Sequence, residues 1–427
     1  MLRGIIWFCW AGLASVLFAQ TPATISLTQA RQLALKNHPR VASADLAAQA
    51  SKSAVAEIRS AYYPSLTSNT SAVATPGHNS VLSAGAVTTS SIFDRVASGL
   101  VASQLLTDFG RTKNLENSAK LRSESKDQEA LETRSQVLAE VSETYFNALA
   151  AEAVLKVAQA TLDLRRVTLR QVTALSQSAL RSTLDVSFAQ VNVSQAELDL
   201  VRAQDEAKAN HARLSAAMGN DTDRPFSVSD EPLPPELNPN VDALIGQAMQ
   251  ARPDLAALRL NQLSLERAAA AEKELRNPTI SAAAVAGVAP IKDARLPEAY
   301  SAAGVNVSIP ILNGGLFKAR HEEAESRAAA SAKDVQTLSL QIARDVRVAW
   351  LDANDAFQRL DVTARMVAEA AEAVRLAQAR YDAALGSIVE LSQAQLNQTS
   401  AEIAAAAAKY EYLDRRAVLD YAMGVLR

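Results

Sequence analysis

The chain has 427 residues, with 43 Lys and Arg, 46 Asp and Glu, and a formal net charge of −3. Basic and acidic side chains are interspersed without long blocks of one sign, which excludes an electrostatic footprint for nucleic acid and indicates solvated helix faces. The only cysteine, Cys9, lies in the N-terminal apolar stretch. The chain beyond that stretch therefore has neither a disulfide nor a thiol.

The N-terminus reads MLRGIIWFCWAGLASVLFAQ, which has the pattern of a secretory signal peptide. Arg3 precedes an apolar stretch that ends at the small residue Ala19 and is short for a membrane span. Lipid attachment at Cys9 does not fit, because Phe8 precedes the cysteine and only eight residues would be removed. We therefore expect residues 1–19 to be a signal peptide and the chain to be exported. No later segment has the roughly 18 consecutive apolar residues of a transmembrane helix.

After this peptide the chain consists of two similar halves. An offset of 205 pairs residues 103–219 with residues 308–424 without a gap, and 14 of the last 39 paired positions are identical. Upstream of these segments an offset of 214 pairs Pro39 with Pro253. The expected organisation is a first repeat, a Pro-rich connector and a second repeat, at residues 20–224, 225–240 and 241–427.

Long helices are predicted in both repeats. Residues 111–218 and 316–385 contain no Gly and no Pro, and apolar residues recur in them at four-three spacing. Such a seam is typical of a helix paired in a coiled coil, so we expect antiparallel hairpins with turns near residues 175–183 and 384–388. We expect Gly386 to stop the helix at the second turn. The predicted helices are residues 27–60, 111–174 and 184–218, then 241–276, 316–385 and 387–423.

Two short strands are predicted in each repeat. The clearest pattern lies before Ile309, where Ala, Val, Val and Ile alternate with small or polar residues. A length near ten with one apolar face suits a transmembrane strand, and a soluble four-stranded sheet is the alternative. Four strands cannot close and an open edge is unstable in lipid, so membrane strands would have to be pooled among several copies. The predicted strands are residues 66–75, 96–106, 279–288 and 300–311.

The same strand-to-helix corner is predicted twice. The sequences are SQLLTDFGRTKN in the first repeat and SIPILNGGLFKAR in the second. Pro310 is expected to end the strand, because proline cannot donate to a ladder. Glycine permits turns that residues with a Cβ atom resist. The expected corner residues are therefore Gly110, Pro310, Gly314 and Gly315.

Five further segments resemble the TolC-like outer-membrane efflux protein family. In chain order they read NHPRVASA, YYPSL, ARPDLAAL, IPILNGG and ARYDAALGSIVELSQAQ. Together with the duplication, the resemblance covers essentially all of the chain after the signal peptide. It implies a mostly α fold with a small β part, in which duplicated halves carry long antiparallel α-hairpins and four transmembrane strands. It also implies a trimeric 12-stranded β-barrel on an α-helical barrel.

The function that the resemblance implies is an outer-membrane channel-tunnel of a tripartite efflux or type I secretion system. Such a duct is passive, and it lies in the outer membrane with a long periplasmic portion. The implied partners are two further copies of the chain, a periplasmic adaptor protein, an inner-membrane transporter and outer-membrane lipid. A periplasmic adaptor is the first alternative, but adaptors interrupt one hairpin with β-domains. A structural coiled-coil envelope protein is the second, and it would need neither strand pairs nor corner glycines.

The resemblance also implies the residues of the periplasmic tip, where the hairpin turns meet the adaptor. Asp185 and Glu390 are equivalent in the two repeats and match an acidic position of the pore constriction, although first-turn helix acids are common for other reasons. A second acidic ring of some family members falls on Phe188 and Gln393, which are not acidic. Tyr381 is expected to pack in the helix seam. The tip residues are Leu180, Arg181, Ser182, Thr183, Leu385, Gly386, Ser387 and Ile388.

Enzyme chemistry is not indicated. The four histidines are isolated, without metal-ligand spacing. No Walker loop, no nucleophile elbow and no CxxC motif occurs. We expect no catalytic residues, no metal and no cofactor, so energy for transport would come from a partner.

Overall fold

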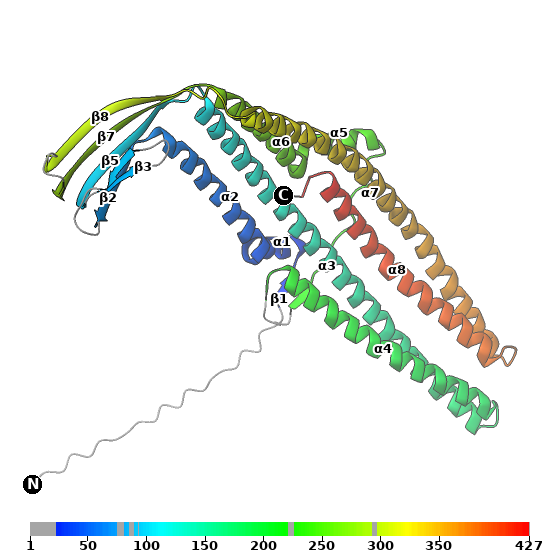
Figure 1. The fold of residues 1–427 in the computed structure, drawn as a ribbon. Helices are drawn as coiled ribbons and strands as arrows, with labels where there is room; N and C mark the ends of the chain where they lie inside the picture. Colours follow the sequence, from blue (N-terminus) through cyan, green and yellow to red (C-terminus); the bar gives the residue numbers. More distant parts are fainter. Residues whose placement is uncertain are drawn as a thin grey trace, which may run out of the picture. The chain divides into compact units, whose positions relative to one another are not determined.

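The computed structural model describes residues 23–74, 81–84, 89–92, 94–220, 226–292 and 297–426. The predicted signal peptide, residues 1–19, lies outside these residues. The described chain is mostly helical with a small β part, as predicted (Figure 1). The helices are α1 (Leu27–Asn37), α2 (Pro39–Arg59), α3 (Arg111–Gln177), α4 (Thr183–Ala217), α5 (Val241–Ala251), α6 (Pro253–Lys273), α7 (Leu316–Asp382) and α8 (Ile388–Ala422). None of the described helices is long and apolar enough to cross a membrane.

In the described part of the chain, eight strands form three sheets. One is a four-stranded antiparallel sheet with the order β2-β5-β7-β8, and the other two are pairs, β1 with β6 and β3 with β4. Neither pair was predicted, because segments of three or four residues are too short to show periodicity. The strands are β1 (Ala23–Ile25), β2 (Ser65–Val73), β3 (Val81–Ala84), β4 (Thr89–Ile92), β5 (Arg95–Thr107), β6 (Phe226–Val228), β7 (Thr279–Ile291) and β8 (Ala299–Ser308).

Two predicted helices are each divided in the structure. The segment predicted as one helix at residues 27–60 breaks before Pro39, and that at residues 241–276 breaks before Pro253. Proline disfavours a helical conformation in the residue before it. His38 and Arg252 accordingly adopt extended ψ values of 124° and 122°. The apolar pattern continues across both breaks, which is why periodicity did not reveal them.

The chain folds into two compact units that do not follow the sequence repeats. Among the residues that the structure describes, the hairpin unit comprises those within 23–34, 141–234 and 363–411, and the sheet unit comprises those within 35–140, 235–362 and 412–426. Each unit therefore contains segments from both repeats. The duplication supplies similar pieces, but neither repeat forms a compact unit by itself.

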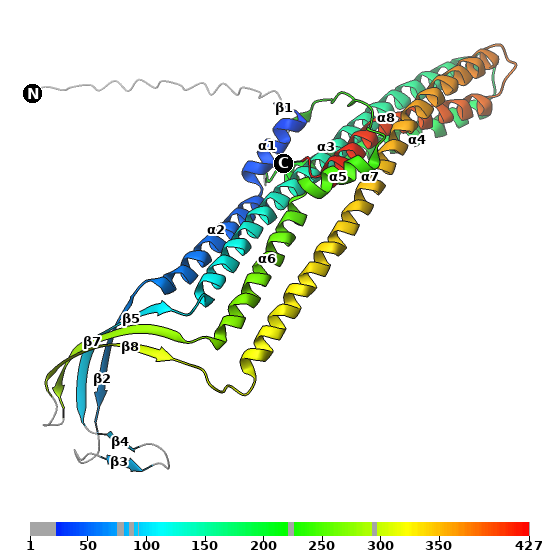
Figure 2. The same ribbon diagram turned by 90° about the horizontal axis from the view of Figure 1, so that it is seen from above.

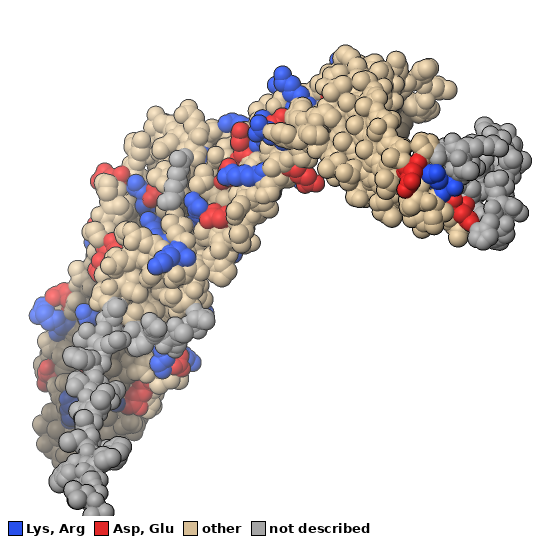
Figure 3. Space-filling model, turned by 90° about the vertical axis from the view of Figure 1, so that its left-hand side faces the viewer, with Lys and Arg blue, Asp and Glu red and all other residues tan. Residues whose placement is uncertain are grey.

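The four-stranded sheet forms one end of the sheet unit, beyond the ends of α2, α3, α6 and α7 (Figure 2). Its middle pair joins the two repeats, since β5 comes from the first and β7 from the second. Arg95 is the only charged residue in the four strands, and Figure 3 shows them mainly uncharged on the face drawn. Within the described chain, the outer edges of β2 and β8 have no strand beside them. Such edges are ready to pair with further strands.

Two glycines face each other across the middle pair of this sheet. Gly99 of β5 is paired with Gly287 of β7, which is paired in turn with Tyr300 of β8. A Cβ atom on Gly287 would lie 2.5 Å from the Tyr300 hydroxyl oxygen and 2.6 Å from the carbonyl oxygen of Ser98. The tyrosine side chain thus occupies the space that the two missing side chains leave.

The helices of the sheet unit have their own apolar core. Its fully buried members include Leu255 of α6, Ile342 and Val346 of α7, and Leu419 near the end of α8. Leu244 of α5 also belongs to this cluster. The cluster holds the end of α8 against the junction of α5 and α6, where the ARPDLAAL segment lies.

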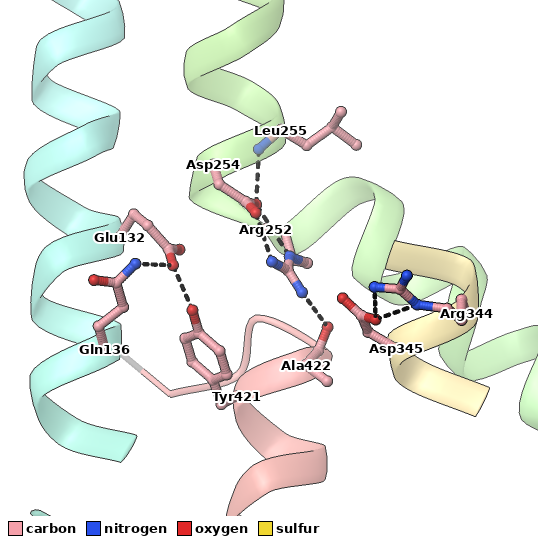
Figure 4. A network of polar contacts seen from close by, with 9 residues as sticks. All are labelled: Glu132, Gln136, Arg252, Asp254, Leu255, Arg344, Asp345, Tyr421 and Ala422. Carbon is pink, nitrogen blue, oxygen red and sulfur yellow. Dashed lines mark hydrogen bonds and ion pairs between the residues drawn. The ribbon is translucent and has the colours of Figure 1, made fainter. Parts of the chain in front are cut away.

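A polar network at this junction explains the Arg and Asp of that segment (Figure 4). The Arg252 guanidinium donates to both carboxylate oxygens of Asp254, at 3.0 and 2.5 Å, and to the carbonyl oxygen of Ala422 at 3.4 Å. The Tyr421 hydroxyl beside it donates to Glu132 at 2.6 Å. Burial raises the pKa of Glu132 and of Tyr421. Arg252 thus ties α6 to the last carbonyl groups of α8.

We expect Arg252→Met to destabilise the protein by about 3 kcal/mol, because it leaves a half-buried carboxylate without its partner. Arg344→Met is the matched control. Arg344 is also paired with an aspartate, Asp345, but its side chain is 66% exposed, so its loss should cost about 1 kcal/mol or less. Thermal unfolding of the detergent-solubilised variants measures the difference. Equal midpoints for the two variants would contradict it.

The hairpin unit contains the two hairpin turns. One joins α3 to α4 and the other joins α7 to α8, and in each a residue of left-handed conformation lies two positions after the end of the preceding helix. These residues are alanines, Ala179 with φ of 56° and Ala384 with φ of 61°. The amide of the next residue then bonds a carbonyl five residues back, Leu180 to Leu175 and Leu385 to Arg380. Gly386 does not stop the helix, so that expectation was wrong, and the serine-rich first turn is built like the second.

The left-handed backbone of Ala179 and Ala384 predicts that glycine at these positions would stabilise the protein. We expect Ala179→Gly and Ala384→Gly each to stabilise the protein by about 1 kcal/mol, since an L-residue pays about that much in this region. Ala174→Gly, at an exposed position inside α3, should instead destabilise it by about 1 kcal/mol. The midpoint of thermal unfolding checks the sign. A loss of stability in all three variants would show that the alanines are not strained.

Candidate functional site

The predicted tip residues fall on and beside the two hairpin turns of the hairpin unit. Leu180 and Leu385 are 68% and 73% exposed and occupy equivalent places. Ser182 accepts a hydrogen bond from the amide of Leu184, and Ser387 accepts one from the amide of Glu390, so each serine caps the helix that follows. Thr183 is the first residue of α4 and is exposed.

Ile388 differs from the other predicted tip residues because its side chain is buried. It is 3% exposed and belongs to a core cluster with Tyr381 and Leu391, both fully buried. Val172 and Ala189 complete the contact between the two hairpins. The side chain of Ile388 therefore stabilises the turn from inside, while that of Leu385 is exposed to solvent.

Tyr381 joins the two hairpins through both its ring and its hydroxyl. The Arg181 guanidinium lies 4.1 Å from the ring centroid and also donates to the carbonyl oxygen of Tyr381. The tyrosine hydroxyl donates to Asp185 at 3.3 Å. Burial, and then the charge of Asp185, raise the pKa of Tyr381, so the hydroxyl keeps the proton that it donates. Two residues of the first hairpin thus bind one residue of the second.

Glu390 has a different partner from its equivalent, Asp185. Its carboxylate forms an ion pair with Arg380 at 3.0 Å, and Arg380 also donates to the carbonyl oxygen of Leu385 at 3.3 Å. A Cβ atom on Gly386 would lie 3.2 Å from both Arg380 and Glu390. Glycine at this position therefore makes room for the ion pair and does not end the helix.

The sequence did not indicate the contacts made by Arg181 and Arg380. Neither residue has a counterpart in the other repeat, since Arg181 corresponds to Gly386 and Arg380 to Leu175. The partners of Arg181 are about 200 positions away in the chain. The only signal in the sequence was this asymmetry. An arginine that is present in one repeat alone can pair with only one of the two equivalent acids, so Asp185 and Glu390 were bound to have different partners.

The strand-to-helix corners of the sheet unit are built alike in both repeats. Two consecutive residues have positive φ in each, 55° and 109° at Phe109 and Gly110, and 62° and 84° at Gly314 and Gly315. The amides of the two second residues bond Asp108 and Asn313 at 3.3 and 3.2 Å. The corner thus depends on left-handed backbone, and the first repeat places a phenylalanine where the second has glycine.

The predicted end of the last strand is corrected by the structure. β8 ends at Ser308, before Pro310, and the residues from Ile309 to Asn313 have no regular secondary structure and are largely exposed. Pro310 therefore lies just beyond the strand and not inside it. The missing amide hydrogen explains why the ladder does not continue.

Metal ligands do not gather anywhere in the described part of the chain. No group of three His, Cys, Asp or Glu side chains there could hold an ion. His211 is hydrogen-bonded to Glu152 at 2.7 Å, and His321 lies 3.3 Å from Glu325.

Several solved structures share this fold. Over 93% of this chain, TM-scores are 0.78 for the outer membrane protein VceC of Vibrio cholerae, 0.79 for the CmeC channel of Campylobacter jejuni and 0.74 for the open MtrE channel of Neisseria gonorrhoeae. The sequence identities are 18%, 16% and 20%, and the matches cover 96%, 85% and 88% of those chains. No protein of curated function matches the sequence.

Sequence identities of 16–20% to these structures do not establish a family, but a match to a family model does. The model described as outer membrane efflux protein matches residues 30–220 and 244–425, which are nearly the whole of both repeats. The match begins again after the Pro-rich connector, as expected of a duplicated chain. The chain is a member of the outer membrane efflux protein family.

Proposed function

We propose that the protein is a passive outer-membrane channel-tunnel of a tripartite efflux or type I secretion system. One observation carries the proposal above the others. A nearly uncharged four-stranded sheet with two free edges is joined, at two equivalent corners, to the long helices α3 and α7. An adaptor or an envelope filament has no use for such a sheet, whereas a shared barrel requires it.

Closure of the barrel requires further copies of the chain. Four strands are too few, because the smallest outer-membrane barrels have about eight, and lipid does not tolerate an unpaired strand edge. We propose a homotrimer, in which β8 of each copy pairs with β2 of the next and twelve strands close in lipid. The nearly uncharged strands suit a lipid environment. The helices would form the periplasmic tunnel.

The two hairpin turns are the proposed periplasmic tip. Leu180 and Leu385 present apolar side chains to solvent, and an exposed apolar residue on a turn suits contact with an adaptor. Asp185 and Glu390 would form the constriction, with six carboxylates in a trimer. Energy would come from an inner-membrane transporter, since the duct itself has no proposed catalytic residue. Export of the chain would use the signal peptide at residues 1–19.

The mass of the detergent-extracted protein tests the assembly. Light scattering on a sizing column should give three copies per particle, recovered from the outer-membrane fraction. The same particle should conduct ions when it is inserted in a planar bilayer. A monomer that stays soluble without detergent would contradict the proposal and leave a periplasmic coiled-coil role. A trimer that does not conduct would contradict the duct but not the shared barrel.

A further inference from the structure

A groove between α4 and α8 in the hairpin unit has the features of a ligand site. Its volume is about 300 Å³, which lies at the lower end of the range for small-molecule pockets. Its rim carries three apolar side chains, Phe188, Val389 and Leu396, which are 43%, 55% and 53% exposed. Apolar side chains grouped at a concave surface offer an apolar ligand a place to leave water.

Arg165 of α3 also lines this groove, and it is a buried cation with a neutral partner. The side chain is 7% exposed and donates to the amide oxygen of Gln395. Among the described residues, no carboxylate lies close enough to the Arg165 guanidinium to shift its pKa. Burial lowers the pKa of Arg165, yet a guanidinium remains charged at neutral pH. A buried charge without a counter-ion is costly, so an anion at this place would be stabilised.

The other polar side chains of the groove already have partners. Asn192 donates to Ser392 at 2.9 Å, and the hydroxyls of Thr161 and Thr399 lie 3.3 Å apart. Asp199 accepts a hydrogen bond from Gln195 at 3.0 Å and lies 3.7 Å from Arg202. Arg165 is therefore the lining group whose charge is least compensated.

Residues that line the groove lie on the same faces of α4 and α8 as Asp185 and Glu390, the proposed constriction residues. Phe188 and Asn192 follow Asp185 by three and seven residues on α4, and Gln393 follows Glu390 by three on α8. Residues at such spacings share one face of a helix. A solute that passes the constriction would meet the groove next. This step rests on the proposed function.

We propose that the groove binds a small amphipathic carboxylate. The carboxylate accepts hydrogen bonds from the Arg165 guanidinium, which matches it in shape and charge. The apolar body lies on Phe188, Val389 and Leu396. The anion supplies the charge that Gln395 cannot, and the apolar rim selects against small inorganic anions. The substrate class that this site indicates is an organic acid with an apolar body.

Binding of naphthalene-2-carboxylate to the full chain in lipid nanodiscs tests the proposal, with naphthalene-2-carboxamide as the neutral analogue and empty nanodiscs as the lipid control. Isothermal titration should detect the acid and not the amide. Arg165→Gln should weaken binding about tenfold to a hundredfold, since a hydrogen bond to a charged group is lost. Arg166→Gln is the matched control, because Arg166 is 47% exposed and paired with Glu197, and it should bind like the native chain.

Phe188→Ala provides a second test if Arg165→Gln does not fold. It removes an exposed side chain and should weaken binding severalfold. Equal binding of acid and amide, or native affinity in both variants, would overturn the proposal. Loss of the trimer in an Arg165→Gln variant that keeps its helical fold would also overturn it, and would assign the groove to contact between copies. A particle that binds the acid but does not conduct refutes the duct alone, and one that conducts without binding refutes this site alone.

Discussion

Replacement of Gly287 by valine is expected to reduce the amount of the proposed trimer at least tenfold. The new Cβ atom would lie 2.6 Å from the carbonyl oxygen of Ser98 on the neighbouring strand, where no real Cβ atom is found. The Tyr300 hydroxyl, at 2.5 Å, can swing aside because it is the end of a side chain, but the backbone oxygen cannot. Overpacking of this kind costs about 1–3 kcal/mol at each site. A threefold assembly would contain it three times.

The comparison for this prediction is Gly304→Val in β8. A Cβ atom there has nothing within 4 Å in the chain, so valine should be accepted, and its strand propensity is higher. The fraction of protein that runs as a trimer from outer-membrane extracts is the measurement. A double variant, Gly287→Val with Tyr300→Ala, should not recover assembly, because the clash with Ser98 remains. Recovery would assign the effect to the tyrosine instead, and normal assembly of Gly287→Val would contradict the tight strand contact.

The sequence predicted the long helices well because their signal is long. An apolar seam that runs through α7, and another through α4, without Gly or Pro leaves little choice of element. The breaks before Pro39 and Pro253 were missed, although the prolines were visible, since the helical pattern resumes in the same phase on the other side. Periodicity could not reveal the pairing of β1 with β6, because each strand contributes only three residues to it.

The turns show a second limit of prediction from sequence. Glycine is the usual left-handed residue at a helix end, so Gly386 was the natural candidate. The structure places the left-handed residue two positions earlier, at Ala384, and repeats it at Ala179. Backbone hydrogen bonds from Leu180 to Leu175 and from Leu385 to Arg380 close the turns at these alanines. The contact of Arg181 with Tyr381 was equally invisible, because it depends on how two hairpins pack and not on local pattern.

Asp185→Asn combined with Glu390→Gln is expected to lower the cation preference of the channel about tenfold in bilayer conductance. The two substitutions remove one carboxylate from each hairpin, and therefore six from a trimer. A narrow ring of like charge produces a potential of several kT, which raises the local concentration of cations. Tyr381 contacts Asp185, and Arg380 contacts Glu390. Because asparagine and glutamine keep an oxygen that can accept these hydrogen bonds, the double variant tests the proposed pore charge apart from the contacts that hold the hairpins.

The control for the constriction is a double variant with the same change in charge, Asp205→Asn with Glu372→Gln. Both residues are in the hairpin unit, exposed, and paired within their own helix, with Lys208 and Arg375. If the selectivity arises from a ring at the turns, the control should keep the native reversal potential in a salt gradient. High salt should reduce the difference, since the screening length falls to about 3 Å at 1 M. Native selectivity in the first variant would assign Asp185 and Glu390 to capping their helices and fastening the turns, and would remove them from the pore.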